Sequence, residues 1–176
     1  MRVPTAAERL LPTLIDVHVR SGNRDSIQKI NKAEAEAIVD EIASLVADDG
    51  FGERSIGVVS LLGPDQGKLI FDSLLERIGE EAFLKHHIRC GDARTFQGSE
   101  ADVIFISAVD DYQSGAVMTS NKLDNIRRIN VAASRAKDRL YFFHSFARND
   151  LSELDLRARL MDHFKAPIQG LSNAKG

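Results

Sequence analysis

The sequence is poor in the features that stabilise secreted proteins or insert proteins into membranes. Its 176 residues contain a single cysteine, Cys90, so no disulfide can form within the chain and a reducing compartment is expected. Charged residues such as Glu8 and Arg9 interrupt the N-terminal apolar segment, and no apolar run approaches the roughly 20 residues of a membrane-spanning helix. These absences predict a cytoplasmic protein without a membrane partner.

An excess of basic residues is absent as well. The chain has 23 lysines and arginines against 26 aspartates and glutamates, which gives a net charge of −3. A balance of this kind provides no overall attraction to nucleic acid. Any contact with phosphate groups must therefore be local.

Two common phosphate-binding loops are missing from the sequence. No G-x-G-x-x-G follows an apolar run, which argues against a dinucleotide site. The segment "GPDQGKL" (63–69) has two glycines and a lysine, but its first gap is too short for G-x-x-x-x-G-K-[ST] and Leu69 has no hydroxyl for Mg²⁺. The chain therefore lacks the loop with which nucleotide hydrolases hold the phosphates.

Short apolar runs are present, and they alternate with amphipathic segments. The runs are rich in Val, Ile and Phe and lack polar alternation, which is typical of strands covered on both faces of a parallel sheet. The three strong runs and two weaker ones occupy residues 55–62, 102–108, 139–145, 14–19 and 86–90.

Four helices are expected between these strands. Apolar residues recur at helical spacing, Asn31 and Glu34 can form a capping box, and glycines can end the first two helices. The expected helices run from Asn31 to Gly50, from Pro64 to Gly79, from Asn121 to about Lys137 and from Asp150 to about Phe164. The alternation predicts an α/β fold with an open parallel sheet and helices on both faces.

The length and composition fit one domain with a substantial core. We expect this domain to occupy residues 14–165. Residues 1–13 are expected to be a leader, and residues 166–176 a tail or linker.

The turn "TFQGSE" (95–100), which leads into the run 102–108, is one candidate site. Its polar residues surround Gly98, and backbone N–H groups in such a turn could meet a phosphate. The simpler interpretation is an ordinary turn in which Gly98 takes a positive φ. Spacing alone leaves both interpretations open.

The segment "NIRRINVAASRAKDR" (125–139) is a second candidate. On a helical wheel Arg128 and Arg135 lie nearly opposite an apolar stripe formed by Ile126, Ile129, Ala133 and Ala136. We therefore expect Arg135 to project into solvent or into a partner's cleft. The small neighbouring side chains would leave its guanidinium free to reach an anion.

Possible metal ligands are weaker candidates. His86, His87 and Cys90 lack a second ligand pair at zinc-site spacing. The acids Glu100, Asp102, Asp110 and Asp111 could hold Mg²⁺ in a nuclease, although acids at the end of a strand are commonly solvated. We expect no metal site within this chain.

Several segments, taken in order, resemble the motifs of superfamily 1 helicases. "TFQGSEADVIFIS" resembles motif V and "RRINVAASRAKDRLYFF" resembles motif VI. "IGVVSLLGPDQGKLI" stands where motif IV is expected, and "NKAEAEAIV" resembles the helix start that precedes it. The chain thus resembles the second, C-terminal RecA-like motor domain of the branch that contains RNA-surveillance and Okazaki-fragment-processing helicases. It is most similar to the large bacterial members.

This resemblance implies a three-layer RecA-like fold of the P-loop NTPase type, and it implies ATP and Mg²⁺ as ligands. ATP would lie between this domain and the first RecA-like domain of the same parent chain, and a single strand of DNA or RNA would cross both. By the resemblance Arg135 would be the catalytic arginine finger. Gln97, Gly98 and Glu100 would face the nucleotide.

The resemblance also implies a nucleic-acid track. Ser60 and Thr95 would approach the nucleic-acid backbone. Asn130 and Ser134 would support motif VI, and they are the other two residues expected to bind nucleic acid. The loop from Leu61 to Gly63 lacks the aromatic residue that many relatives use to stack on a base.

The parts of the motor that belong to the first domain are absent from the sequence. These are the phosphate-binding lysine and the acids that hold Mg²⁺, so the chain alone is expected to be inactive. An alternative is a non-catalytic, stand-alone RecA-like module that binds nucleic acid or a partner. A nuclease using Asp110 and Asp111 is a third possibility.

Overall fold

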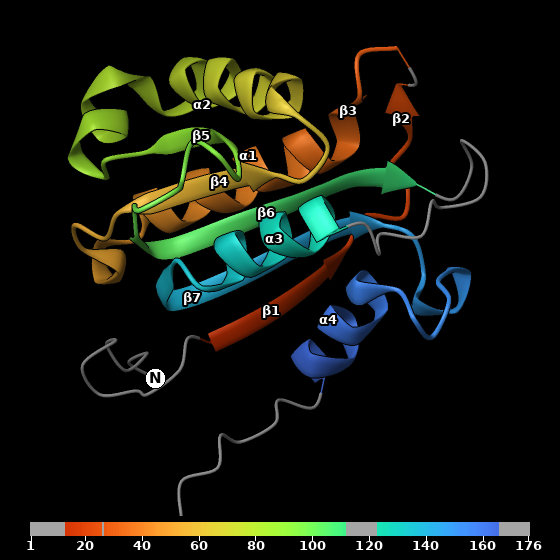
Figure 1. Cartoon of the computed structure of the whole chain (residues 1–176). Helices are drawn as coiled ribbons and strands as arrows, with labels where there is room; N and C mark the ends of the chain where they lie inside the picture. The colour runs from red at the N-terminus through yellow and green to blue at the C-terminus, as the bar shows by residue number, and fades with distance from the viewer. Residues whose placement is uncertain (1–12, 26, 112–122, 166–176) are drawn as a thin grey trace, which may run out of the picture.

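A computed structural model describes residues 13–25, 27–111 and 123–165. A five-stranded parallel sheet forms the centre of the molecule, in the order β1-β7-β6-β4-β5 (Figure 1). The strands are β1 (Thr13–His18), β4 (Ile56–Ser60), β5 (Arg89–Asp92), β6 (Ala101–Asp111) and β7 (Ala136–Ser145). A separate antiparallel pair joins β2 (Arg24–Asp25) to β3 (Ile30–Asn31).

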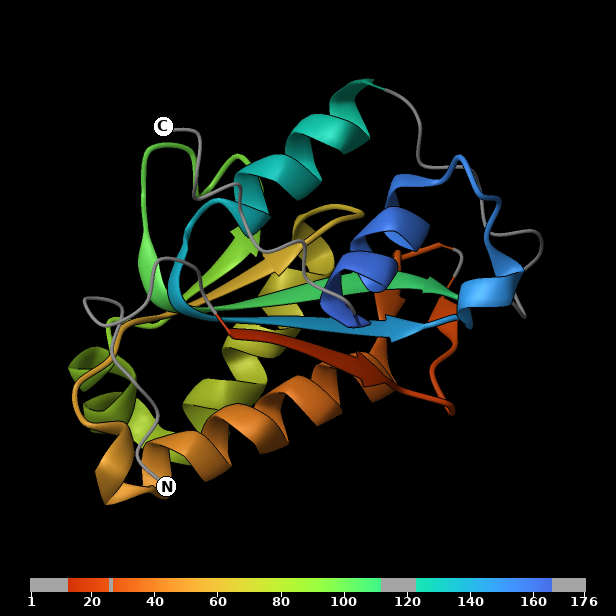
Figure 2. The ribbon, with the colours of Figure 1, turned by 90° about the horizontal axis from the view of Figure 1, so that it is seen from below.

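Helices cover both faces of the sheet, so the architecture has three layers. Two of them, α1 (Lys32–Ala47) and α2 (Pro64–Lys85), lie on one face. The other two, α3 (Leu123–Ala133) and α4 (Leu156–Lys165), lie on the opposite face (Figure 2). The expected α/β fold, an open parallel sheet flanked by helices as in RecA-like domains, is confirmed. No helix in the described ranges is both long and apolar enough to cross a membrane.

The two-sided covering explains the unbroken apolar runs. Neighbouring residues of β4 point to opposite faces, so Val58 packs under α1 and α2 while Val59 packs under α3. In β6, Phe105 and Ile104 divide in the same way between the two cores. Because both faces of each central strand are buried, most of its positions favour apolar residues; Ser107 in β6 is an exception that donates to Glu34.

The first two helices end differently from the prediction. Asn31 caps α1 as expected, because its side chain accepts from the Glu34 N–H at 3.1 Å. The helix ends at Ala47, before Gly50, where Asp48 provides the C-cap. In α2 the predicted end at Gly79 is a break rather than a stop. This glycine has φ +79°, and the helix resumes and runs to Lys85.

The third helix ends earlier and the fourth begins later than predicted. α3 stops at Ala133, and β7 begins at Ala136, so the expected helix to Lys137 is wrong. α4 begins at Leu156 because the Asp155 carboxylate accepts from the Arg157 N–H at 2.9 Å. A short 3₁₀ turn, Arg148–Asp150, ends where the helix was predicted to begin, and residues 151–155 are not helical.

The weak run 86–90 is only partly a strand. His86 caps the end of α2, and His87 has a positive φ of 45°. β5 therefore begins at Arg89 and continues to Asp92.

Candidate functional site

Two turns that were singled out in the sequence meet at one edge of the sheet. β6 and β7 are parallel neighbours, and Ala101 pairs with Ala136 at their amino ends. The turn 96–100 comes just before β6, and Arg135 comes just before β7. The Ala101 N–H donates to the Arg135 carbonyl at 3.1 Å. We call this side of the sheet the amino edge.

Arg135 lies in the two-residue turn between α3 and β7, not on a helix as predicted. Its side chain is half-buried, and its buried Nε has no hydrogen-bond partner among the described residues. No carboxylate in the described part of the chain pairs with its guanidinium. A buried N–H without an acceptor costs about 1–3 kcal/mol. The residue is therefore suited to an anionic acceptor supplied from outside the domain.

The turn 96–100 has an anchored start and an exposed tip. Phe96 is fully buried, whereas Gln97, Gly98 and Glu100 are exposed. Gly98 has φ +80°, as the simpler interpretation of this turn expects. The N–H groups of Gln97 and Ser99 donate within the segment, to the carbonyls of Arg94 and Phe96. Those two N–H groups are thus not presented to a phosphate.

Two basic residues that sequence reasoning missed contact Glu100. Lys137 in β7 places its Nζ 3.1 Å from the Glu100 carboxylate. Arg89 in β5 donates from Nη2 to the Glu100 carbonyl at 3.1 Å, and its guanidinium lies 5.6 Å from the centre of the Phe96 ring. Lys137 comes from β7, the neighbour of β6, and Arg89 from β5 at the edge of the sheet, so only the arrangement of the strands reveals them.

The predicted nucleic-acid residues do not gather at one place. Ser60 ends β4, and Thr95 follows the end of β5, so both lie toward the carboxyl ends of the strands, which we call the carboxyl edge. Asn130 is exposed on α3, and Ser134 is exposed in the turn beside Arg135 at the amino edge. The segment after β5 thus leads from the carboxyl edge to the amino edge.

The polar groups at the carboxyl edge differ in what they offer a ligand. The Ser60 hydroxyl is buried and has no hydrogen-bond partner among the described residues. The Thr95 hydroxyl lies 3.2 Å from the Asp92 carboxylate, which also accepts from the Thr95 N–H. The next carbonyl after Ser60, that of Leu61, accepts from Arg128 of α3 at 3.2 Å.

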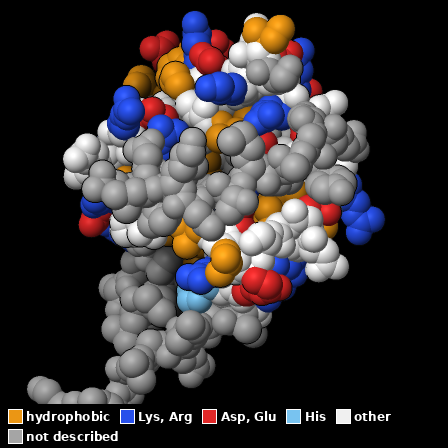
Figure 3. Space-filling model, turned by 45° about the vertical axis from the view of Figure 1, so that its right-hand side comes forward, with side chains coloured by type: hydrophobic (Ala, Val, Ile, Leu, Met, Phe, Trp, Pro, Cys, Tyr) orange, Lys and Arg blue, Asp and Glu red, His pale blue; other side chains and the backbone are white. Residues whose placement is uncertain are grey.

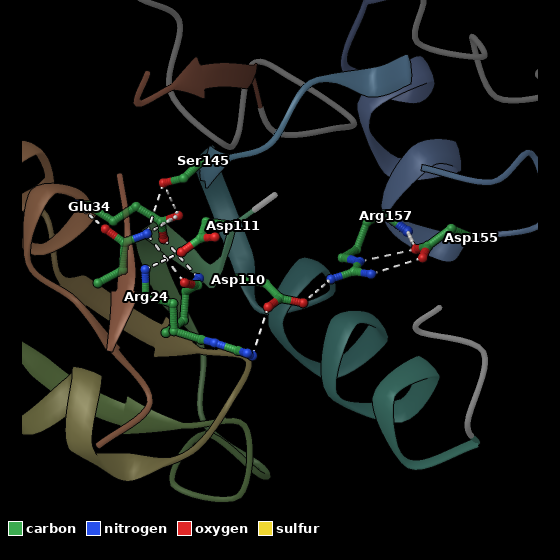
Figure 4. Close-up of polar contacts among 9 residues, drawn as sticks. Arg24, Glu34, Asp110, Asp111, Ser145, Asp155 and Arg157 are labelled. Carbon is green, nitrogen blue, oxygen red and sulfur yellow. Dashed lines mark hydrogen bonds and ion pairs between the residues drawn. The ribbon is translucent and has the colours of Figure 1, made fainter. Parts of the chain in front are cut away.

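A buried polar cluster lies under the carboxyl edge (Figure 4). The Glu34 carboxylate accepts from the hydroxyls of Ser107 and Ser145, each at 2.7 Å, and from the Val109 N–H at 2.8 Å. Burial raises the pKa of Glu34 to about 7. Val109 has a positive φ of 66°, which is unusual for a β-branched residue. The expected capping box does not form in full, because Glu34 turns into the core.

The acids proposed for Mg²⁺ are occupied by arginines or far apart. Asp110 accepts from Arg24 at 2.8 Å and from Arg157 at 2.9 Å, and Asp111 accepts from the Arg24 backbone N–H (Figure 4). Glu100 and Asp102 lie at the other end of β6. Eight residues of strand separate Asp102 from Asp110, which is roughly 25 Å. The four acids therefore cannot share one ion, and the adjacent pair, Asp110 and Asp111, is already engaged by Arg24 and Arg157.

Other metal sites are not seen in the described ranges. His86 Nδ1 lies 3.1 Å from the Arg54 carbonyl, and burial raises the pKa of the half-buried Cys90 thiol to about 12. Across the residues that the structure describes, no group of three or more His, Cys, Asp or Glu side chains could hold a metal ion. Mg²⁺ therefore finds no ligand set in this part of the chain.

The surface carries charges of both signs. In Figure 3 lysine and arginine side chains are interspersed with aspartate and glutamate on the face shown. This mixture agrees with the net charge of −3. Attraction to a nucleic-acid backbone would have to come from a few positioned groups.

Comparison with known proteins identifies the family. The model of the AAA domain family AAA_12 matches residues 5–145, which include both candidate turns and all five sheet strands. No curated protein matches the chain. The match covers well over half of the 176 residues. The chain therefore belongs to the AAA_12 family, whose domain is the C-terminal RecA-like half of superfamily 1 helicases.

Proposed function

We propose that this chain is the second motor domain of an ATP-dependent superfamily 1 helicase and supplies the arginine finger of its ATP site. One observation carries the proposal. Arg135 stands at the amino edge beside the turn 96–100, and its buried Nε lacks an acceptor among the described residues. The residue has the donors for a phosphate but no partner of its own.

The proposed roles are those that the resemblance implies, and the positions of the side chains at the amino edge support them. Arg135 would reach the γ-phosphate across the cleft and stabilise the charge that develops on the transferring phosphoryl group, an effect worth about 10³–10⁵ in rate. Gln97, Gly98 and Glu100 would face the nucleotide from the neighbouring turn. Glu100 is exposed, and its carboxylate would contact the ribose or order the cleft.

The other wall of this ATP site would come from the first RecA-like domain of the parent chain. The sequence has no lysine-containing phosphate loop, and the described residues offer no ligand set for Mg²⁺. ATP phosphates and Mg²⁺ would be held by that first domain. This domain alone would therefore hydrolyse no ATP.

A single strand of DNA or RNA would pass along the carboxyl edge. The buried Ser60 hydroxyl without a described partner supports a role there, and Thr95 would join it after release from Asp92. Asn130 and Ser134 would support motif VI. The Ser134 N–H donates to the Asn130 carbonyl at 3.0 Å, and Ser134 directly precedes Arg135. A cytoplasmic parent related to the large bacterial helicases would fit these features.

The proposal is tested by replacing Arg135 in the full-length protein. Arg135→Ala should lower kcat for ATP by about 10³-fold or more, because the charge on the transferring group would lose its partner. The control is Arg159→Ala, which removes an exposed arginine from α4. An unchanged kcat in Arg135→Ala would instead favour a non-catalytic module, and unfolding of that variant would show that Arg135 is structural.

A further inference from the structure

Arg89, the first residue of β5, contacts both ends of the turn 96–100. Its guanidinium lies over the buried Phe96 ring at 5.6 Å, and its Nη2 donates to the Glu100 carbonyl at 3.1 Å. Arg89 is exposed on the outermost strand of the sheet, where an arginine would ordinarily be solvated. Here its side chain contacts both ends of the turn that leads into β6.

The hydrogen bonds inside this turn do not reach its last residue. The N–H groups of Gln97 and Ser99 donate to carbonyls within the segment 94–96. Gly98 at the tip has φ +80°, a conformation that glycine enters and leaves easily. The contacts that the structure gives Glu100 come from outside the turn, from Arg89 and Lys137.

The two outside contacts hold the turn in different ways. The Lys137–Glu100 pair is about half exposed on both sides, at 49% and 52%. Exposed pairs of this kind contribute little to stability. Arg89 combines a charged donor to a carbonyl with a cation–π contact to a fully buried ring. Arg89 is exposed as well, so its advantage over Lys137 is that it contacts the turn at two points, Phe96 and Glu100.

We propose that Arg89 is a positioning residue that holds Glu100 beside Arg135 and thereby sets the affinity of the cleft for the nucleotide. The inference rests on the proposed function. Arg135 is also held from the other side, because its own N–H donates to the Ala132 carbonyl at 3.3 Å and the chain runs on continuously from α3 to β7. Loss of Arg89 should thus loosen the nucleotide-facing turn while leaving the arginine finger in place.

The test compares variants of the full-length protein. Arg89→Ala should raise KM for ATP about three- to fivefold, as expected for the loss of a hydrogen bond and a cation–π contact at an exposed site, with kcat changed less than about twofold. Arg89→Lys keeps a cation over Phe96 and one donor, so it should recover part of the lost affinity. The control is Arg77→Ala, which removes an exposed arginine paired with Asp40 on the far helix pair.

A second measurement needs no nucleotide. Amide hydrogen exchange of residues 97–100 should become at least several-fold faster in Arg89→Ala than in Arg77→Ala, with equal melting temperatures. Unchanged KM and unchanged exchange would overturn the inference, as would a fall in kcat at constant KM. If Arg135→Ala leaves kcat intact, the proposed function fails, while the exchange measurement still decides whether Arg89 orders the turn.

Discussion

The Glu34 carboxylate lies in the interior of the domain, and all of its hydrogen-bond donors are uncharged. They are the side chains of Asn31, Ser107 and Ser145 and the N–H of Val109. Neutral donors compensate only part of the cost of burying a charge, so burial raises the pKa from 4.5 to about 7. The cluster joins α1 to the carboxyl ends of β6 and β7.

This pKa predicts how stability depends on pH. The folded state binds the Glu34 proton more tightly than the unfolded state, so the contribution of Glu34 to stability is complete below about pH 4.5 and is lost as pH rises through about 7. The loss amounts to up to about 3 kcal/mol. Glu34→Gln should remove this fall, which urea unfolding from pH 4.5 to 8 would measure.

The matched control is Glu36→Gln, an exposed glutamate on the same helix. Its stability should follow the wild-type pH dependence throughout. If Glu34→Gln also follows the wild type, the carboxylate does not take up a proton in this range and the account of the buried cluster is wrong.

Local sequence patterns could not reveal this residue's role. The spacing of Asn31 and Glu34 predicts a capping box, and the half of it made by Asn31 is present. The other half is replaced because Gln66 of α2 accepts from the Asn31 N–H at 2.8 Å. That contact joins residues 35 positions apart, so it depends on how α1 and α2 pack.

At the scale of elements, α2 shows how a glycine can interrupt a helix without ending it. Gly79 has φ +79° and ψ 166°, a region that other residues enter with strain. A Cβ added there would meet nothing within 4 Å, so any cost of substitution comes from the backbone. The residues that follow still complete the helix to Lys85.

Gly79→Ala should therefore destabilise the domain by about 1–3 kcal/mol. The neighbouring exposed substitution Glu80→Ala should change stability by less than about 0.5 kcal/mol. Chemical unfolding of both variants measures the difference. Equal stabilities would mean that the break moves or closes at no cost, contrary to the geometry of α2.

The elements themselves were largely predictable, and their ends were not. The three strong apolar runs predicted β4, β6 and β7, because burial on both faces leaves a strong signal, whereas the weak run 86–90 shares only Arg89 and Cys90 with β5. The end of α3 was missed because Ala133 and Ala136 continue the helical spacing into β7. The pairing of Ala136 with Ala101 decides that boundary, and a single segment carries no information about pairing.

On the scale of the whole molecule, the proposed function makes this domain one half of an ATP site. The amino edge combines Arg135 with the exposed turn 96–100, and the described residues contain no ligand set for Mg²⁺. The sequence identified both turns through their motifs. It missed Arg89 and Lys137, because these residues reach Glu100 from other strands. A site built across strands is visible only after the sheet order is known.

The central claim is that Arg135 completes the ATP site in the transition state. The most direct test compares the affinity of the full-length protein for ADP with its affinity for ADP plus aluminium fluoride, which imitates the transferring phosphoryl group. Arg135→Ala should weaken binding of the transition-state mimic by about 100-fold or more and leave ADP binding nearly unchanged. Equal affinities of wild type and variant for the mimic would contradict the claim.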